Sequence, residues 1–257
     1  PWFGGKKPIQ FSSSLSHSKQ FLYSGRSTNV DKSRSFNITS LSVGLSKRLT
    51  VPDDNFYFSN GVSFQYYDLN NYNTGLFTFG DGSSRNLAFN LGLTRNNKGV
   101  NPIYPTSGSE FSISAKFTLP YSLFNGVDYG NLGNLQENKL KYDPSKGLNV
   151  QATSQGQVPS LGDYLGIYQT LPNGQKIYQV VDNYQDAAAD QAKVDQLKFN
   201  WLEYYKLKFK ADWYTKVAGT PQKALVLRAL GEFGYLGAYN GARGVVPFER
   251  FFLGGDG

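Results

Sequence analysis

The sequence contains no cysteine and no methionine, and it has a single histidine, His17. Without cysteine the chain forms neither disulfides nor thiolate metal sites, and it offers no cysteine nucleophile. One histidine also excludes a metal centre built from several histidines. From these residues we therefore expect no metal ion.

Long apolar runs are missing as well. The longest run of apolar residues is Ala224–Leu227, whereas a transmembrane helix needs about 20. The opening residues, "PWFGGKKP", lack the basic and apolar regions of a signal peptide. The last residues, "PFERFFLGGDG", run from an apolar stretch into a glycine-rich turn. From both ends we expect the chain to be a piece of a longer protein.

Aromatic residues, glycine, serine and asparagine are abundant instead. Aromatics make up 16% of the chain, and there are 28 glycines. Aromatic side chains suit the pleated surface of strands, and glycine, asparagine and serine suit turns. The composition therefore predicts an all-β fold.

The formal net charge is +7, but it is unevenly distributed. Residues 120–196 hold five lysines and eight acidic residues, so the positive charge lies on the rest of the chain. A basic chain can indicate a nucleic-acid or membrane partner. Here the basic residues alternate with apolar ones along predicted strands, and we expect no nucleic-acid partner.

Alternation of apolar and polar residues is the main pattern in the sequence. In 85–94, for example, Leu87, Phe89 and Leu91 share one face, as is typical of a half-buried strand. Within 35–49 the phase slips between Ile38 and Leu41, which predicts a bulge. Seven segments carry the pattern: 9–23, 35–49, 55–69, 85–94, 109–119, 203–214 and 222–237.

The strands and their connections favour a membrane barrel over a soluble sheet. Several segments reach or exceed the ~9–11 residues of a tilted membrane strand. Short turns at 49–55, 96–108 and 215–224 alternate with longer polar connections, as in outer-membrane barrels. Aromatic residues near the predicted strand ends could form interfacial girdles: Tyr23, Tyr66, Tyr67, Tyr204, Trp213, Tyr214 and Tyr235. We predict an antiparallel transmembrane β-barrel in the bacterial outer membrane, with 120–196 as a long extracellular loop that contains a short helix within 186–199. A soluble β-sandwich binding module is an alternative, because soluble antiparallel sheets alternate too.

Three stretches resemble BamA-family proteins, the central subunits of the outer-membrane β-barrel assembly machinery. The turn and strand "NPIYPTSGSEFSISAKFTLP" are similar to that family's Pro-Thr-x-Gly turn, with Pro105 restricting φ and Gly108 free to take a positive φ. The ending "PFERFFLGGDG" looks like the entry to the family's sixth extracellular loop. The opening "PWFGGKKPIQFSSSLSHS" resembles the family's turn between its fourth and fifth strands.

The resemblance implies a fragment of a sixteen-stranded barrel with about seven strands present. Residues 9–23 would be the fifth strand and 222–237 the eleventh, while the POTRA domains and the first and last strands would be absent. It implies an insertase for outer-membrane proteins that works with unfolded client proteins, accessory subunits and the lipid bilayer. Because no covalent chemistry is implied, we expect a protein that is not an enzyme, with no catalytic residues and no cofactor. A partner at 120–196 is a further candidate. Alternatives are a translocation-assembly or two-partner secretion barrel, or a porin-like anion channel.

Two groups of residues are candidates for binding. On the predicted lumen face, Lys206, Lys208 and Lys210 form a basic ladder, and Arg228 and Glu232 lie on the same face of the last strand, where they could pair with each other or with the sixth loop. By the resemblance, the root of the sixth loop would be formed by Phe251, Gly254 and Gly255.

Overall fold

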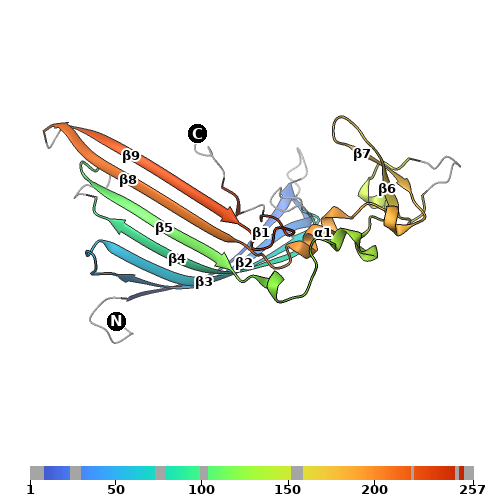
Figure 1. Cartoon of the computed structure of the whole chain (residues 1–257), viewed down its shortest axis with the longest axis horizontal. Helices are drawn as coiled ribbons and strands as arrows, with labels where there is room; N and C mark the ends of the chain where they lie inside the picture. Colours follow the sequence, from blue (N-terminus) through green and yellow to red (C-terminus); the bar gives the residue numbers. More distant parts are fainter. Residues whose placement is uncertain are drawn as a thin grey trace.

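The computed structural model contains one large antiparallel sheet with an inserted lobe at one end (Figure 1). Residues 9–23, 30–72, 79–98, 104–151, 159–220, 223–246 and 249–251 are described. Seven strands follow one another in space in the order β1-β2-β3-β4-β5-β8-β9. Their bounds are β1 Ile9–Tyr23, β2 Val30–Arg48, β3 Phe56–Asn70, β4 Gly82–Asn96, β5 Gly108–Thr118, β8 Tyr205–Gly219 and β9 Ala224–Gly237. Within the described part of the chain, β1 and β9 do not pair with each other, so the sheet is an open, curved wall and not a closed barrel.

The predicted alternation gives the sheet two chemically different faces. In β8, Lys206, Lys208 and Lys210 lie on one face, which we call the inner face, and Leu207 and Phe209 lie on the other, the outer face. The strand pairing assigns the two faces on the neighbouring strands as well, because directly paired residues point to the same side of the sheet. The outer face exposes large apolar side chains on several strands, among them Phe11, Leu15, Leu41, Val43, Ile113, Leu207, Leu225, Leu227 and Phe233. Such a surface fits contact with lipid.

The bulge predicted between Ile38 and Leu41 is wrong. Strand β2 pairs without interruption with β3 from Ser35 to Arg48. Register instead shifts between Phe21 and Leu22 of β1, where Phe21 pairs with Ser35 and Leu22 with Asp31. The apparent slip has another cause: Phe36 and Ile38 are inner-face residues covered by a local apolar core, so they are apolar on the side where β2 is otherwise polar.

Glycine permits the backbone conformation at the start of β5, where the connection from β4 ends. Gly108 has φ +97, and a Cβ at this position would lie 2.3 Å from the carbonyl oxygen of Asn97. This confirms the positive φ expected in the Pro-Thr-x-Gly turn. The contrast in loop length is weaker than the sequence indicated, however, because the 71–81 and 97–107 connections have similar lengths. The clear difference is the long insertion between β5 and β8.

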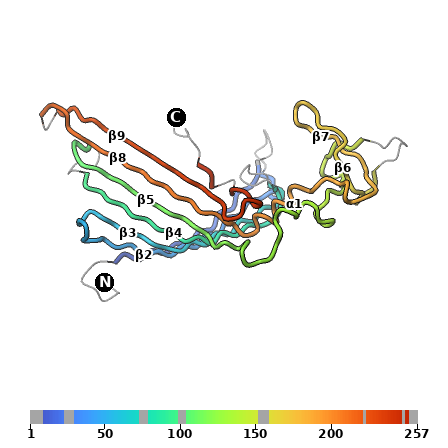
Figure 2. The backbone as a smooth tube through the Cα atoms, in the orientation of Figure 1, coloured from blue at the N-terminus to red at the C-terminus, as the bar shows by residue number. Residues whose placement is uncertain are grey.

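The insertion forms a small lobe beyond the ends of β5 and β8 (Figures 1 and 2). It contains the hairpin β6 Leu165–Thr170 and β7 Lys176–Val180, the helix α1 Gln191–Lys198, and 3-10 turns Tyr121–Leu123, Leu132–Asn134, Gln136–Asn138, Pro144–Lys146 and Tyr184–Asp186. The helix confirms the prediction for 186–199, and Asp190 caps it by accepting a hydrogen bond from the amide of Lys193. The β6–β7 hairpin was not predicted.

An apolar core lies on the inner face at the end next to the lobe. It joins β2 and β3 to the segments before β8 and after β9, and its buried members are Phe36, Tyr67, Leu69, Phe79, Phe199, Leu202, Tyr204 and Val246. Tyr67 and Tyr204 therefore face inward, and their assignment to an interfacial girdle is wrong. In the described ranges, no helix is long and apolar enough to cross a membrane.

Candidate functional site on the inner face of the sheet

After β9 the chain folds back against the inner face. We call this stretch, of which 238–246 and 249–251 are described, the returning segment, and Glu249 makes its main contact with the sheet. The Glu249 carboxylate lies 2.6 Å from Nζ of Lys116 on β5 and 3.2 Å from Nζ of Lys206 on β8. The Tyr204 hydroxyl donates to the same carboxylate at 2.9 Å, and Lys206 Nζ also donates to the Glu249 carbonyl oxygen at 2.7 Å. Two strands and the segment before β8 are thus joined to one side chain on the returning segment.

Phe251 packs beside the Glu249 carboxylate and against Gly234 of β9, which has no side chain. Lys206 Nζ lies 4.6 Å from the centre of the Phe251 ring, a cation–π distance. On β9, a Cβ added to Gly234 would lie 2.6 Å from Cζ of Phe251. The glycine therefore makes room for the ring, and Lys206 covers it with positive charge.

The local charges keep Glu249 ionised. Burial acts to raise the pKa of Glu249, but the charge and hydrogen bond of Lys116 outweigh it, with help from Tyr204 and Lys206, so that its pKa lies below the ordinary value. For the Tyr204 hydroxyl, burial and the adjacent Glu249 charge both raise the pKa. The phenol thus stays protonated and acts as a donor to the carboxylate.

A second, fully buried ion pair holds the first part of the returning segment. Arg243 donates to Glu203 at 2.7 Å, and both side chains are almost completely buried. Arg243 also donates to the carbonyl oxygens of Lys198, at 2.6 Å, and Trp201. Glu203 in turn accepts from the amide and hydroxyl of Ser122 at 2.8 and 2.6 Å. The returning segment is therefore tied both to the sheet and to the lobe.

The structure places the predicted lysine ladder on the inner face, but its charges are largely neutralised. Lys206 pairs with Glu249, and Lys210 pairs with Glu232 at 2.8 Å. Lys208 alone of the three has no acidic partner within 4.0 Å among the described residues.

Arg228 and Glu232 do not pair with each other. Arg228 instead makes two 2.9 Å hydrogen bonds to Asp212, which also accepts from the Tyr214 hydroxyl at 2.9 Å. Glu232 pairs with Lys210, as described above. Both residues therefore join β9 to β8, and among the described residues neither forms an ion pair with the returning segment.

Most of the charge on the inner face lies on one part of it. Paired inner positions of β1 to β4 are mainly small or uncharged: Ser12, Ser14, Ser16, Ser40, Ser42, Gly44, Gly61, Ser63, Gln65, Asn90 and Gly92. Those of β5, β8 and β9 include Glu110, Lys116, Lys206, Lys208, Lys210, Asp212, Arg228 and Glu232. The first group is the neutral wall and the second the charged wall, and the returning segment docks on the charged wall.

Comparison with known families matches this architecture. The model of the Omp85 superfamily domain matches residues 1–257. The chain belongs to the Omp85 superfamily. Members of this superfamily are outer-membrane proteins of the insertion and secretion type. Neither a curated protein nor a solved structure matches the chain.

Sequence reasoning found part of this Omp85 site. The candidates Phe251 and Lys206 are in contact, whereas Gly254 and Gly255 lie outside the described residues. Glu249, Arg243 and Lys116 were not singled out, and Tyr204 was assigned to an interfacial girdle instead. One signal for Glu249 was present, since it is the only acidic residue in the apolar stretch "PFERFFLGG", which follows strands with inward-facing lysines.

Proposed function

We propose that this Omp85 chain belongs to a BamA-like insertase, which folds and inserts β-barrel proteins into the outer membrane. The observation that carries the proposal is the returning segment, whose Glu249 and Phe251 dock on Lys116, Lys206 and Gly234 of the inner face. In the resemblance described above, the sixth loop of a BamA-like barrel enters the lumen from this position in the chain.

The proposed activity needs no covalent step. Clients would be recognised by pairing of extended strands, a mode in which backbone hydrogen bonds provide affinity. The wall β1–β9 would serve as a rigid scaffold, because seven paired strands and the buried Arg243–Glu203 pair hold the returning segment in one position. Unfolded outer-membrane proteins, accessory subunits and a partner at the 120–196 lobe are the proposed interactors.

A translocation-assembly or two-partner secretion barrel is the alternative within the superfamily. A porin-like anion channel is less well supported, because Lys206 and Lys210 are paired with carboxylates and offer little free positive charge to a passing anion.

Reconstitution tests the proposal. The full protein in liposomes should accelerate the folding of an urea-denatured porin, followed by its gel shift without heating, relative to liposomes alone. A charge-neutral Glu249→Gln variant should show less acceleration, and a Glu232→Gln variant should retain it. Unchanged porin folding together with export of a soluble passenger would support the secretion alternative. Steady, anion-selective conductance in planar bilayers would support the channel.

A further inference from the structure

On β4, one arginine lies at each end of the row of apolar side chains that faces outward. Arg85 and Arg95 both lie on the outer face, with Leu87, Phe89, Leu91 and Leu93 between them. Ten residues of strand span about 33 Å, or about 25 Å along the membrane normal at a tilt of about 40°. The two guanidinium groups therefore lie about one hydrocarbon thickness apart, one near each rim.

The two arginines differ in their partners. Arg95 is neutralised by Asp53 at 2.8 Å and stacks on Phe56. Arg85 stacks between Tyr66 and Trp201, with its guanidinium carbon 5.6 and 5.8 Å from their ring centres. Within the described ranges Arg85 has no carboxylate partner, and its one side-chain hydrogen bond is to the amide oxygen of Asn200 at 2.6 Å. A charge at a bilayer rim without a counter-charge attracts anionic headgroups.

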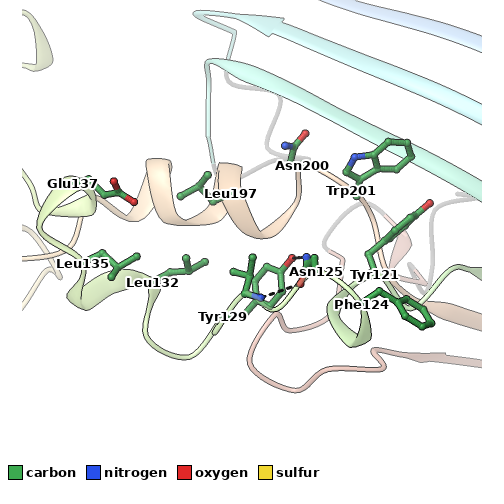
Figure 3. A pocket seen from close by; sticks show the side chains of 11 residues that line it. Tyr121, Phe124, Asn125, Tyr129, Leu132, Leu135, Glu137, Leu197, Asn200 and Trp201 are labelled. Carbon is green, nitrogen blue, oxygen red and sulfur yellow. Dashed lines mark hydrogen bonds between the residues drawn. The ribbon is translucent and has the colours of Figure 1, made fainter.

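An apolar pocket of about 630 Å³ opens beside Arg85, between α1 and the 121–137 segment (Figure 3). Its wall is largely aliphatic and aromatic, and Trp201, Tyr121 and Phe124 group at one end, with Asn200 nearby (Figure 3). The ring centres of Tyr121 and Trp201 lie 5.0 Å apart with the rings tilted by 43°, and Phe124 is 80% exposed. The pocket therefore continues the apolar outer face past the end of β5.

We propose that this rim is a binding site for an anionic, phosphate-bearing lipid of the adjoining leaflet. The headgroup phosphate pairs with Arg85, and part of an acyl chain occupies the pocket lined by Phe124, Leu135 and Leu197. A lipid fits better than a soluble anion because the charge lies beside an apolar pocket that is continuous with the lipid-facing surface. The site would fix the lobe against the membrane surface.

Quenching of Trp201 fluorescence by brominated lipids tests the site. The probe is a variant of the full protein in which Trp201 is the only tryptophan, placed in nanodiscs of phosphatidylcholine with a minor fraction of phosphatidylglycerol. When the bromine is carried by phosphatidylglycerol, quenching should indicate about fivefold enrichment over bromine carried by phosphatidylcholine, since one cation near the surface contributes about that much. Arg85→Gln should abolish the enrichment, whereas Arg95→Gln, the matched control at the opposite rim, should leave it intact.

Three further measurements test the charge of Arg85, the apolar pocket and the source of the phosphate separately. Arg85→Lys keeps the charge and should keep most of the enrichment, which guards against a folding defect in the glutamine variant. Leu135→Ser should reduce quenching by both lipids, because the acyl chain loses an apolar contact. Soluble glycerol phosphate should not compete. Equal quenching by the two lipids, or competition by glycerol phosphate, would overturn the lipid site and leave a general annular contact or a free-anion site.

Discussion

Nζ of Lys116 lies 2.6 Å from Oε1 of Glu249, although the two residues are 133 positions apart in the chain. Through this contact the segment after β9 is held on β5, two strands away from the strand that precedes it. The docking of the returning segment therefore rests on a small number of side chains that can be changed one at a time.

Replacing Glu249 with glutamine should loosen the returning segment. Glutamine keeps the shape but leaves Lys116 and Lys206 without a counter-charge, and the expected loss is about 1–3 kcal/mol in the free energy of unfolding. Urea unfolding in detergent measures it, and limited proteolysis reports whether the segment has been released. The control is Glu232→Gln, which removes a half-exposed pair with Lys210 and should change the unfolding midpoint very little, because exposed ion pairs contribute little to stability. Equal effects of the two variants would argue against a special role for Glu249.

Acid should release the same segment. Because the pKa of Glu249 is lowered below its ordinary 4.5, its stabilisation is fully present above that value and is lost as the pH falls through the lower, folded-state pKa. The difference in urea midpoint between the wild type and Glu249→Gln should therefore be constant from pH 7 to about pH 5 and shrink below pH 4. A difference that stays constant down to pH 3 would contradict this account.

A single methyl group at Gly234 should displace Phe251. A Cβ at Gly234 would lie within 2.6–2.8 Å of three atoms of the Phe251 ring, whereas a Cβ at Gly231 meets nothing within 4 Å. Gly234→Ala should therefore increase proteolysis after β9, and Gly231→Ala should not. Adding Phe251→Ala to Gly234→Ala should bring little further loss, because the ring is already displaced, and this non-additivity is the diagnostic result.

The Arg243–Glu203 pair should be the most sensitive contact between the lobe and the returning segment. Both side chains are buried, so Arg243→Met leaves an uncompensated carboxylate and should cost about 3–5 kcal/mol. The double variant Arg243→Met with Glu203→Gln should recover part of the loss. The matched control is Lys146→Met, which breaks the more exposed pair with Asp190 and should change the unfolding midpoint very little. A small effect of Arg243→Met would mean that the lobe is held by its apolar contacts alone.

Much of the sheet was predictable because membrane strands need a strict two-residue period. The segment 9–23 coincides with β1, and 222–237 differs from β9 by only two residues at its start. The bulge in 35–49 was wrong because Phe36 and Ile38 face an inner core that forms only when distant segments meet. Local alternation cannot distinguish such a covered inner position from an outer one.

The candidate site was less predictable because its partners are distant in sequence. Lys206 could be selected from the alternation in its strand and Phe251 from the family resemblance, but the Glu249 contacts join three separate parts of the chain. The β6–β7 hairpin was missed for a different reason: its strands of six and five residues are too short to establish a period. Tertiary contacts, and not local preference, define both features.

The division of the inner face into a neutral and a charged wall has a consequence for movement. A polypeptide that passes along the hydroxyls of β1 to β4 replaces its hydrogen bonds to water with hydrogen bonds to these hydroxyls, and the net free energy is small. It should therefore move along these strands without being held. On the charged wall it meets Lys208 of β8, the ladder lysine that has no acidic partner among the described residues. Charge-assisted hydrogen bonds are roughly twice as strong as neutral ones, so the polypeptide should dwell there. Photocrosslinkers at Ser16 and Ser114, one on each wall, would compare the dwell times, and equal yields would contradict the difference. A polypeptide should therefore move faster along the neutral wall than along the charged wall.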